Sequence, residues 1–375
     1  MGADLGEIGR QFAISGEYVS GGPYGTGHIN DTFAATFHQG SRPTRFILQR
    51  INHHVFKNIE GLMSNIVAVT GYLSSKIRAD GGDPLRETLN LVPTRDGHSF
   101  LQTEGGEFWR AYVFIEGART YESVERIEHV YAAGRAYGNF QDSLRDFPSE
   151  VLVETIPGFH HTGKRFKDFL SAVDADVANR AHAAVPEIEF VTRRGNLVTV
   201  LVDLMSEGKL RRRITHNDTK FNNVMIDDRT GEGLCVIDLD TVMPGLSLYD
   251  FGDSIRSLAN TGAEDEPDLS RVEFDLDVFA SYTRGYLKAT RSSLDREEIE
   301  RLPFAAILMT LECGMRFLED YLRGDTYFKT TRPDHNLDRS RTQFKLIEGM
   351  EEDQEAMALL VERSLAESVD GGSGA

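Results

Sequence analysis

The sequence predicts an α+β protein of two lobes, with a small antiparallel β-sheet lobe that carries one helix and a larger, mainly helical lobe. Three observations support this prediction. Short strand patterns separated by turns fill the first 115 residues, helical spacing dominates the remainder, and 375 residues exceed what one small core usually holds. We therefore expect a β-rich lobe over 1–115 and a helical lobe over 116–375.

The first lobe is expected to contain short strands around a single helix. A short amphipathic stretch spans 9–20, and "YGTGHINDTFAATF" then combines a turn with alternating apolar residues, which is typical of two strands joined by a turn. "RFILQRI" at 45–51 predicts a further strand, and apolar residues at helical spacing predict a helix over 55–79. "LNLVPT", "SFLQT" and "WRAYVFI" predict three more strands, separated by the turns "RDG" and "EGG".

The second lobe shows mostly helical spacing. We expect helices over 123–143, 165–184, 186–206, 270–290, 295–323 and 339–369. One polar hairpin interrupts them, in which "RITHNDTKFNNVMI" and "LCVIDLDTVMPG" are joined by the turn "DDRTGEG". So many polar side chains in one short segment do not build a core, and they indicate either a solvated turn or a site of chemistry.

The charge balance excludes several classes of partner. Lys and Arg number 41 against 59 Asp and Glu, a formal net charge of −18. So acidic a protein repels nucleic acid and anionic lipid. An anionic ligand would need a local positive pocket, for which Lys220 and the arginines at 211–213 are candidates.

The cysteines and the hydropathy pattern predict a cytoplasmic protein. Cys235 and Cys313 lie in apolar patterns without a CxxC partner, which favours a reducing compartment and excludes a structural zinc site of that type. The first residues lack a secretory signal pattern, and no apolar run is long enough to span a membrane.

The segment "THNDTKFNN" has the residue types and spacing of phosphoryl transfer. That reaction needs a group to take the proton of the acceptor hydroxyl and metal ligands to spread the charge of the phosphates. The spacing predicts Asp218 as the base, Asn223 five residues later as a metal ligand, and Asp238 after the hairpin as a second metal ligand. Lys220 is placed to reach the transferring phosphate.

Neighbouring polar residues allow less specific interpretations. The same segment can be an Asx-rich turn that only caps the local backbone. We expect His216 to hold the loop by hydrogen bonds and leave open whether Asn222 is a contact or a turn residue. "YDFGD" contains the letters DFG of protein kinases, but Asp250 lies too far from Asp218 for that role and is expected to brace the loop; Asp253 is expected to be an exposed carboxylate.

"THNDTKFNN", "VIDLDTVMPG" and "DFGDSIR" together resemble the aminoglycoside phosphotransferase-like kinases. "YGTGHIND", "FILQRIN", "ECGMRFLEDYLRGDTYF" and "HNLDRSRTQ" further resemble the N-acetylhexosamine 1-kinases of that family, over about residues 20–350. The resemblance implies the two-lobed protein-kinase architecture. It also implies an ATP- and Mg²⁺-dependent kinase whose small-molecule acceptor is GlcNAc or GalNAc, phosphorylated at the anomeric C1 hydroxyl.

The resemblance also implies roles for particular residues. It makes Asp218 the base and Asn223 and Asp238 the Mg²⁺ ligands. The nucleotide would be covered by the loop 24–30 and would meet the backbone after the last strand, which involves Gly25, Thr26, Gly27, Phe114, Ile115 and Glu116. The sugar would meet Asp218, Arg316, Tyr327, and His28 or Asn30.

Plainer alternatives exist for some of these assignments. The two glycines of the 24–30 loop can be an ordinary hairpin turn, and the backbone at 114–116 can be a plain strand end. Arg316 and Asp320 lie four residues apart on a predicted helix and can form a surface ion pair.

One position departs from the protein-kinase pattern. The third strand of those enzymes carries a phosphate-binding lysine paired with a helix glutamate, whereas "FILQRI" offers Gln49 or Arg50. Side chains alternate along a strand, so only one of the two can face the phosphates. Glu60 on the following helix then has no obvious partner, and an inactive kinase remains an alternative.

Three other functions compete with the sugar kinase. "VIDLDTV" resembles the nucleophile motif of DxD phosphatases, with Asp238 as nucleophile and Asp240 as acid, although the alternating βα units of that fold are missing. The absent strand lysine also fits a non-catalytic sugar or nucleotide sensor. The third alternative is a kinase of the same fold for another acceptor, such as another sugar, choline, homoserine or an aminoglycoside.

Overall fold

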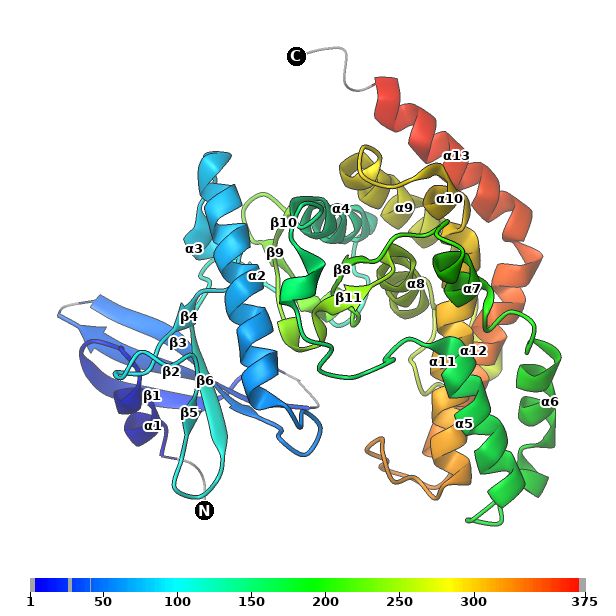
Figure 1. Ribbon diagram of the computed structural model, residues 1–375, viewed down its shortest axis with the longest axis horizontal. Coiled ribbons are helices and arrows are strands. Elements are labelled where there is room, and N and C mark those ends of the chain that lie inside the picture. Colours follow the sequence, from blue (N-terminus) through cyan, green and yellow to red (C-terminus); the bar gives the residue numbers. More distant parts are fainter. Residues whose placement is uncertain (1–3, 26–28, 41, 371–375) are drawn as a thin grey trace.

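The computed structural model of the protein describes residues 4–25, 29–40 and 42–370. A sheet-rich N-terminal region stands beside a larger helical C-terminal region (Figure 1). This arrangement confirms the predicted α+β fold class. The exact division between residues 115 and 116 stays a prediction.

Six strands form the antiparallel sheet of the N-terminal region. Their order is β1-β2-β3-β6-β4, and β5 also pairs with β6. The strands are β1 (Glu17–Pro23), β2 (Asp31–Gln39), β3 (Arg42–Ile51), β4 (Leu91–Val92), β5 (Leu101–Gln102) and β6 (Phe108–Val113). Gln49 of β3 stands opposite Arg110 of β6, so these two side chains leave the same face of the sheet.

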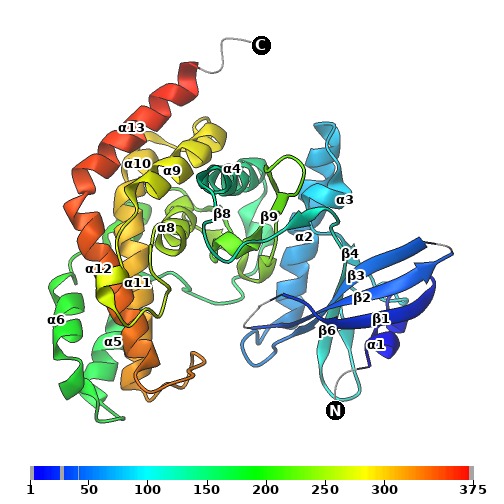
Figure 2. The ribbon, with the colours of Figure 1, turned by 180° about the vertical axis from the view of Figure 1, so that it is seen from behind.

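Helices lie on both sides of this sheet (Figures 1 and 2). Helix α1 (Leu5–Gln11) shares a core with one face of it, which includes Phe37, Leu48 and Trp109. Helix α2 (Ile59–Ala79) and the short α3 (Pro84–Glu87) lie on the other side, toward the helical region. Asn65 of α2 donates hydrogen bonds to the carbonyls of Val153 and Val242, which joins α2 to the C-terminal region.

The predicted polar hairpin forms two small sheets in the C-terminal region. β9 (Val224–Asp227) lies between β10 (Gly233–Val236) and β7 (Ala118–Arg119), and β11 (Met243–Gly245) pairs with β8 (Arg213–Thr215). The loop from β8 to β9 carries Asp218 and Asn223, and the short turn from β10 to β11 carries Asp238. The strand pairing thus brings both predicted parts of the site to one place.

The remaining C-terminal region is helical. It comprises α4 (Ile127–Ser143), α5 (Thr162–Ala175), α6 (Val185–Arg193), α7 (Val200–Ser206), α8 (Ser247–Leu258), α9 (Leu276–Thr290), α10 (Arg296–Glu300), α11 (Leu302–Leu322), α12 (His335–Glu352) and α13 (Gln354–Asp370). α4 and α9 cross closely because each has a glycine at the contact. A Cβ on Gly134 would lie 2.3 Å from the Tyr282 carbonyl oxygen. No helix in the described part of the chain is both long and apolar enough to cross a membrane.

Several long helices predicted from spacing are pairs of shorter ones. The helix expected over 186–206 is divided into α6 and α7, and the one expected over 339–369 into α12 and α13. The helix expected over 295–323 is interrupted at Arg301, just before Pro303 in the first turn of α11. Proline lacks the N–H that a helix interior requires, so it suits a helix start and not a continuous helix.

Candidate active site

The loop between β8 and β9 is held by Asp250 of α8. Its carboxylate accepts hydrogen bonds from the backbone N–H groups of His216 (2.8 Å) and Asn217 (2.7 Å) and from Nε2 of Gln141 (2.7 Å). This confirms that Asp250 braces the loop. It does so from the first turn of α8, a helix that the sequence pattern did not predict.

His216 joins the two predicted turns. Its Nδ1 accepts from the Asp218 N–H (3.3 Å), and its Nε2 lies 2.8 Å from the carbonyl oxygen of Ile237, to which it must donate because a carbonyl can only accept. The Ile237 N–H in turn donates to the carbonyl of Asn223 (2.9 Å). The expectation that His216 holds the loop is confirmed, and Ile237 fixes Asp238 beside it.

Asp218, the predicted base, forms an ion pair with Lys220. Lys220 Nζ lies 2.9 Å from Asp218 Oδ1, and Asn223 Nδ2 donates to the Asp218 carbonyl oxygen (2.8 Å). Burial alone would raise the pKa of Asp218, but Lys220 outweighs it and the pKa is lowered. The pKa of Lys220 is raised, first by the charge of Asp218. Both groups are therefore charged at neutral pH.

Asp238 occupies an unusual backbone conformation at the end of its strand. Its φ of 59° lies in the left-handed region, which aspartate tolerates better than most residues, and its side chain is exposed. Desolvation and repulsion from Asp240 and Asp218 raise the pKa of Asp238 to about 6. Because the side chain is exposed to water, we assign the shift mainly to the neighbouring negative charges.

The donor set suits Mg²⁺. Protein sites usually hold this ion through one or two carboxylates, with the phosphates and water completing the octahedron. Asp238 is a carboxylate crowded by like charge, which a cation would relieve. The hydrogen bonds found among the described residues engage the amide nitrogen of Asn223 and leave its oxygen as a ligand. Asn223 and Asp238 are thus the residues that would hold the ion.

The sequence profile of the phosphotransferase enzyme family matches residues 23–289, which include all of these groups. The chain belongs to the phosphotransferase enzyme family. The match leaves the phosphatase alternative without support.

Solved structures of phosphotransferases share this fold at low sequence identity. A microcompartment-associated aminopropanol kinase has a TM-score of 0.62 at 17% identity, with 95% of this chain and 98% of that chain covered. A Plasmodium vivax ethanolamine kinase has a TM-score of 0.54 at 13% identity, covering 86% and 82%. A spectinomycin phosphotransferase with ADP and spectinomycin has a TM-score of 0.52 at 12% identity, covering 93% and 94%.

In this phosphotransferase, the backbone at 114–116 follows β6 and leads to β7. The carbonyl of Glu116 already accepts from Arg86 Nη2 (3.1 Å), and the Phe114 N–H donates to the carbonyl of Arg45 (3.2 Å). Among the described residues the backbone of Ile115 forms no such bond, and the contact of 114–116 with a nucleotide stays a prediction. Gly25 adopts a φ of 75°, while Thr26, Gly27 and His28 lie outside the described residues.

The strand position that departs from protein kinases is occupied by a hydrogen-bonded glutamine. Gln49 Oε1 accepts from Arg110 Nε (2.9 Å) and Nη2 (2.6 Å), and its Nε2 donates to Thr32 Oγ1 (2.8 Å). Arg50 leaves the other face and pairs with Glu107 (2.6 Å) at the surface. Gln49 is therefore the inward residue, but both ends of its amide already have protein partners.

Sequence reasoning missed Arg110, which forms a buried ion pair with Asp240. Arg110 Nη1 lies 2.5 Å from Asp240 Oδ1, and the two side chains are 1% and 4% exposed. Asn30 Nδ2 donates to the other oxygen of Asp240 (2.7 Å), and its own oxygen accepts from the Asn52 N–H (3.0 Å). These partners occupy both ends of the Asn30 amide, which argues against its predicted contact with the sugar.

Arg316, which was predicted to meet the sugar, does not form the surface ion pair with Asp320 considered above. The Arg316 guanidinium lies over the rings of Phe159 (5.4 Å) and Phe328 (5.7 Å). Asp320 is 4% exposed and accepts from the backbone N–H groups of Tyr327 (2.8 Å) and Phe328 (3.0 Å). Backbone amides satisfy its charge instead, and they fix the loop on which Tyr327 stands exposed.

His160 connects Glu312 of α11 to the loop between β8 and β9. Its Nδ1 lies 2.7 Å from Glu312 Oε1, and its Nε2 donates to the carbonyl of Asn217 (3.0 Å). Thr162 Oγ1 also donates to Glu312 (2.5 Å). His160 lies in the turn before α5, and nothing local in the sequence reveals its partner 152 residues away.

Two expectations about charged residues near the loop are also wrong. Asp253 is buried, not exposed; it accepts from the Thr219 N–H (2.8 Å) and pairs with Arg256 (2.9 Å). The arginines at 211–213 are each paired with a carboxylate, from Asp295, Glu154 and Glu298 respectively. Neutralised in this way, the three arginines offer no positive pocket, which leaves Lys220 as the cation of the loop.

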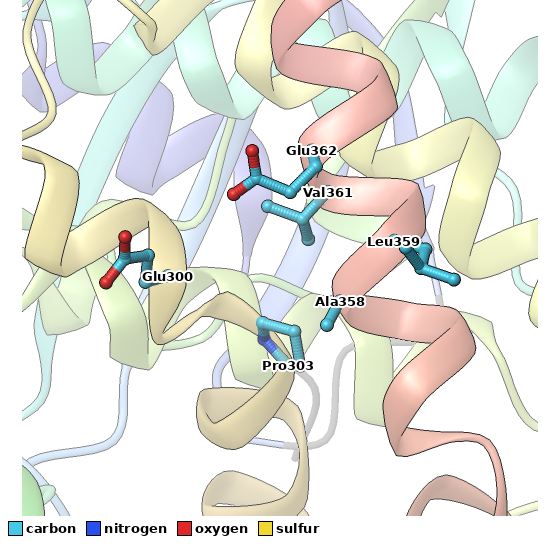
Figure 3. A pocket seen from close by; sticks show the side chains of 6 residues that line it. All are labelled: Glu300, Pro303, Ala358, Leu359, Val361 and Glu362. Atoms are coloured by element: carbon cyan, nitrogen blue, oxygen red, sulfur yellow. The ribbon is translucent and has the colours of Figure 1, made fainter.

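A shallow hollow lies elsewhere in the helical region (Figure 3). It is formed by α10, α11 and α13, and its lining residues are Glu300, Pro303, Ala358, Leu359, Val361 and Glu362. None of them belongs to the loops that carry the candidate active site, so the hollow takes no part in the assignments above.

Proposed function

We propose that this phosphotransferase is an ATP- and Mg²⁺-dependent kinase that phosphorylates the anomeric C1 hydroxyl of N-acetylhexosamines. The observation that carries the kinase part is the joined pair of turns. Asp218 and Asn223 on one turn are bonded through His216 and Ile237 to the turn of Asp238. A base and two oxygen ligands at one place are what phosphoryl transfer requires.

The charge state of Asp218 suits this chemistry. A carboxylate whose pKa is lowered by Lys220 is ionised at neutral pH, so it can accept the proton of the attacking hydroxyl. An anomeric hydroxyl is more acidic than an ordinary alcohol and does not need a strong base. Lys220 can meanwhile face the transferring phosphate. Mg²⁺, when bound, supplies neutralisation of charge on the phosphate oxygens.

The charges on the acceptor side support an uncharged acceptor. Arg165 and Arg316 stand close enough that burial and the charge of Arg316 lower the pKa of Arg165. Within the described residues neither arginine forms an ion pair, and Arg165 donates only to the carbonyl of Phe159 (3.1 Å). Arg316 lies one helical turn beyond Glu312, which His160 ties to the catalytic loop.

These two guanidinium groups, of which Arg316 lies over aromatic rings, repel a cationic acceptor and can donate to the hydroxyl and acetamido oxygens of a sugar. An ammonium acceptor is nevertheless the second candidate, because two of the similar structures are named as aminopropanol and ethanolamine kinases. The arginine pair weighs against it.

A comparison of acceptors tests the proposal. ADP release with ATP and Mg²⁺ is measured with GlcNAc and GalNAc and, in parallel, with choline, ethanolamine, 1-amino-2-propanol and spectinomycin. We expect kcat/KM to be highest for the acetamido sugars, and phosphorus NMR to show a phosphate on C1. Higher kcat/KM for an amine, or a phosphate on C6, would overturn the acceptor assignment. Absence of ADP release above that of an Asp218→Asn control for every acceptor would overturn the kinase itself.

A further inference from the structure

We propose that Arg110 is a positioning residue for the metal-binding turn, which it clamps from the N-terminal sheet through Asp240. The inference rests on the proposed function, because it assumes that Asp238 binds a metal ion. Gln49 occupies the position of the missing strand lysine on β3, and Arg110 stands opposite it on β6.

The guanidinium of Arg110 is fixed on all sides. Gln49 accepts two of its hydrogen bonds, and Nη1 lies 2.5 Å from Asp240 Oδ1. Gln49 is held in turn by Thr32. With 1% exposure, Arg110 is not accessible to a bound ligand. A buried charge is costly without a partner of opposite charge, so this ion pair ties the position of Asp240 to that of Arg110.

Asp240 transmits this position to Asp238. The two residues are separated only by Leu239, and the turn Leu239–Thr241 begins directly after Asp238. The Thr241 hydroxyl donates to the His216 carbonyl (2.7 Å), so the turn is anchored to the catalytic loop as well. A change in the Arg110 contact therefore moves the turn that directly follows Asp238, the proposed ligand.

The clamp also sets the charge that a metal ion would meet. "DLD" presents two carboxylates, but both oxygens of Asp240 have partners, one from Arg110 and one from Asn30. Asp238 is left as the carboxylate available to a cation. Arg110 and Asn30 belong to the N-terminal region and Asp240 to the C-terminal region, so the clamp spans both.

Five variants test the inference, with metal binding as the main readout and the melting temperature as the second. The affinity for Mn²⁺ is measured by electron paramagnetic resonance with a non-hydrolysable ATP analogue and no acceptor. Arg110→Lys cannot donate two bonds to Gln49 and also reach Asp240, and we expect it to weaken metal binding about tenfold. Gln49→Leu leaves the ion pair of Arg110 and Asp240 intact, so it should weaken metal binding less than Arg110→Lys does. It replaces Arg110→Lys in the test if that variant does not fold.

The double variant Arg110→Met/Asp240→Asn separates positioning from stability. It removes both buried charges, so the melting temperature should recover relative to Arg110→Met, whereas metal binding should stay weakened. Arg213→Met is the matched control. Arg213 forms a similarly enclosed pair with Glu298 (2.6 Å), so its loss should lower the melting temperature and leave Mn²⁺ affinity unchanged.

Three results of these measurements decide whether the inference and the proposed function stand. Unchanged Mn²⁺ affinity in folded Arg110→Lys, or full recovery of affinity in the double variant, would make Arg110 a structural residue only. If the wild-type protein binds no Mn²⁺ with the nucleotide analogue, the proposed kinase function and this inference both fall. If the wild type binds metal and only the sugar assignment fails, the inference stands.

Discussion

Lys220 Nζ lies 2.9 Å from Asp218 Oδ1, so the proposed base and the proposed phosphate-facing cation form one ion pair before any substrate is present. Each group holds the other in its charged form. A phosphate that attracts Lys220 would therefore loosen its hold on Asp218, and the carboxylate would become a better proton acceptor when the nucleotide is in place.

The variant Asp218→Asn tests the role of this carboxylate. Asparagine keeps the size of the side chain but cannot take a proton, so kcat should fall about 10²- to 10⁴-fold. Binding of the nucleotide, followed by calorimetry, should change little because the Mg²⁺ ligands remain. A variant that turns over as fast as the wild type would show that Asp218 is not the base.

The variant Asp238→Asn should make the metal-free protein more stable. The pKa of Asp238 is raised from 3.8 to about 6, so the folded state binds this proton more tightly and stability declines as pH rises through that interval. Asparagine cannot ionise, so it removes the destabilising negative charge at this position, and it also tolerates the left-handed backbone. Because the side chain is exposed, we expect a gain of only about 1 kcal/mol at pH 7.

Urea unfolding without metal at acidic and neutral pH measures this gain. The difference between the variant and the wild type should grow from pH 4 to pH 7, and kinase activity should be lost. A stability difference that does not depend on pH would contradict the assigned repulsion.

The buried pair of His160 and Glu312 should give a pH-dependent contribution to stability. Burial alone would lower the pKa of His160, but Glu312 outweighs it and the pKa rises above 6.5; the pKa of Glu312 is lowered below 4.5, because His160 outweighs its burial. The histidine contribution is complete below pH 6.5 and is lost as pH rises through the raised pKa. The glutamate contribution is complete above pH 4.5 and is lost in acid.

Comparison with His160→Gln/Glu312→Gln isolates this pair, since both titrations are removed. The free energy of unfolding of the wild type relative to the double variant should be largest between pH 4.5 and 6.5 and should decline on either side. A relative free energy that rises from neutral to alkaline pH would mean that His160 is neutral in the folded protein.

The variant Asp320→Asn should loosen the loop that carries Tyr327. An amide has one acceptor oxygen instead of two, so some of the N–H groups of Thr326, Tyr327 and Phe328 lose their partner at a cost of about 1–3 kcal/mol. We expect a higher KM for the acceptor with little change in KM for ATP. Asp168→Asn, which removes an exposed pair with Lys164, is the control and should alter neither. Equal effects on both KM values would argue against a specific role of this loop.

The sequence predicted the parts of the site that lie on one hairpin. Asp218, Asn223 and Asp238 are close along the chain, so the strand pattern alone brings them together. Which roles they perform stays a prediction. The fold class followed from hydrophobic spacing, which is set by how each element buries one face.

The supporting residues could not be predicted because their partners are distant in sequence. Arg110 is a charged residue between apolar neighbours on β6, a pattern that usually indicates an exposed side chain. Its ion-pair partner Asp240 comes from the other region and is brought close only by the packing of the two regions. Apolar residues keep their helical spacing across helix breaks such as Arg301, where α10 ends and α11 begins. The spacing therefore does not reveal the break.

The ion pair of Arg110 and Asp240 has a consequence for recombination within the family. Each half of the molecule contributes one member of the pair, so a chimera that joins residues 1–115 of another family member to residues 116–375 of this chain keeps Asp240 but receives a foreign residue opposite it. Unless that residue is positively charged and long enough to contact Asp240, the chimera carries the unpaired charge of Asp240 in its interior. An exchange of one half should therefore succeed only if the new half supplies a suitable partner for Asp240. The two halves are expected to have diverged as a unit.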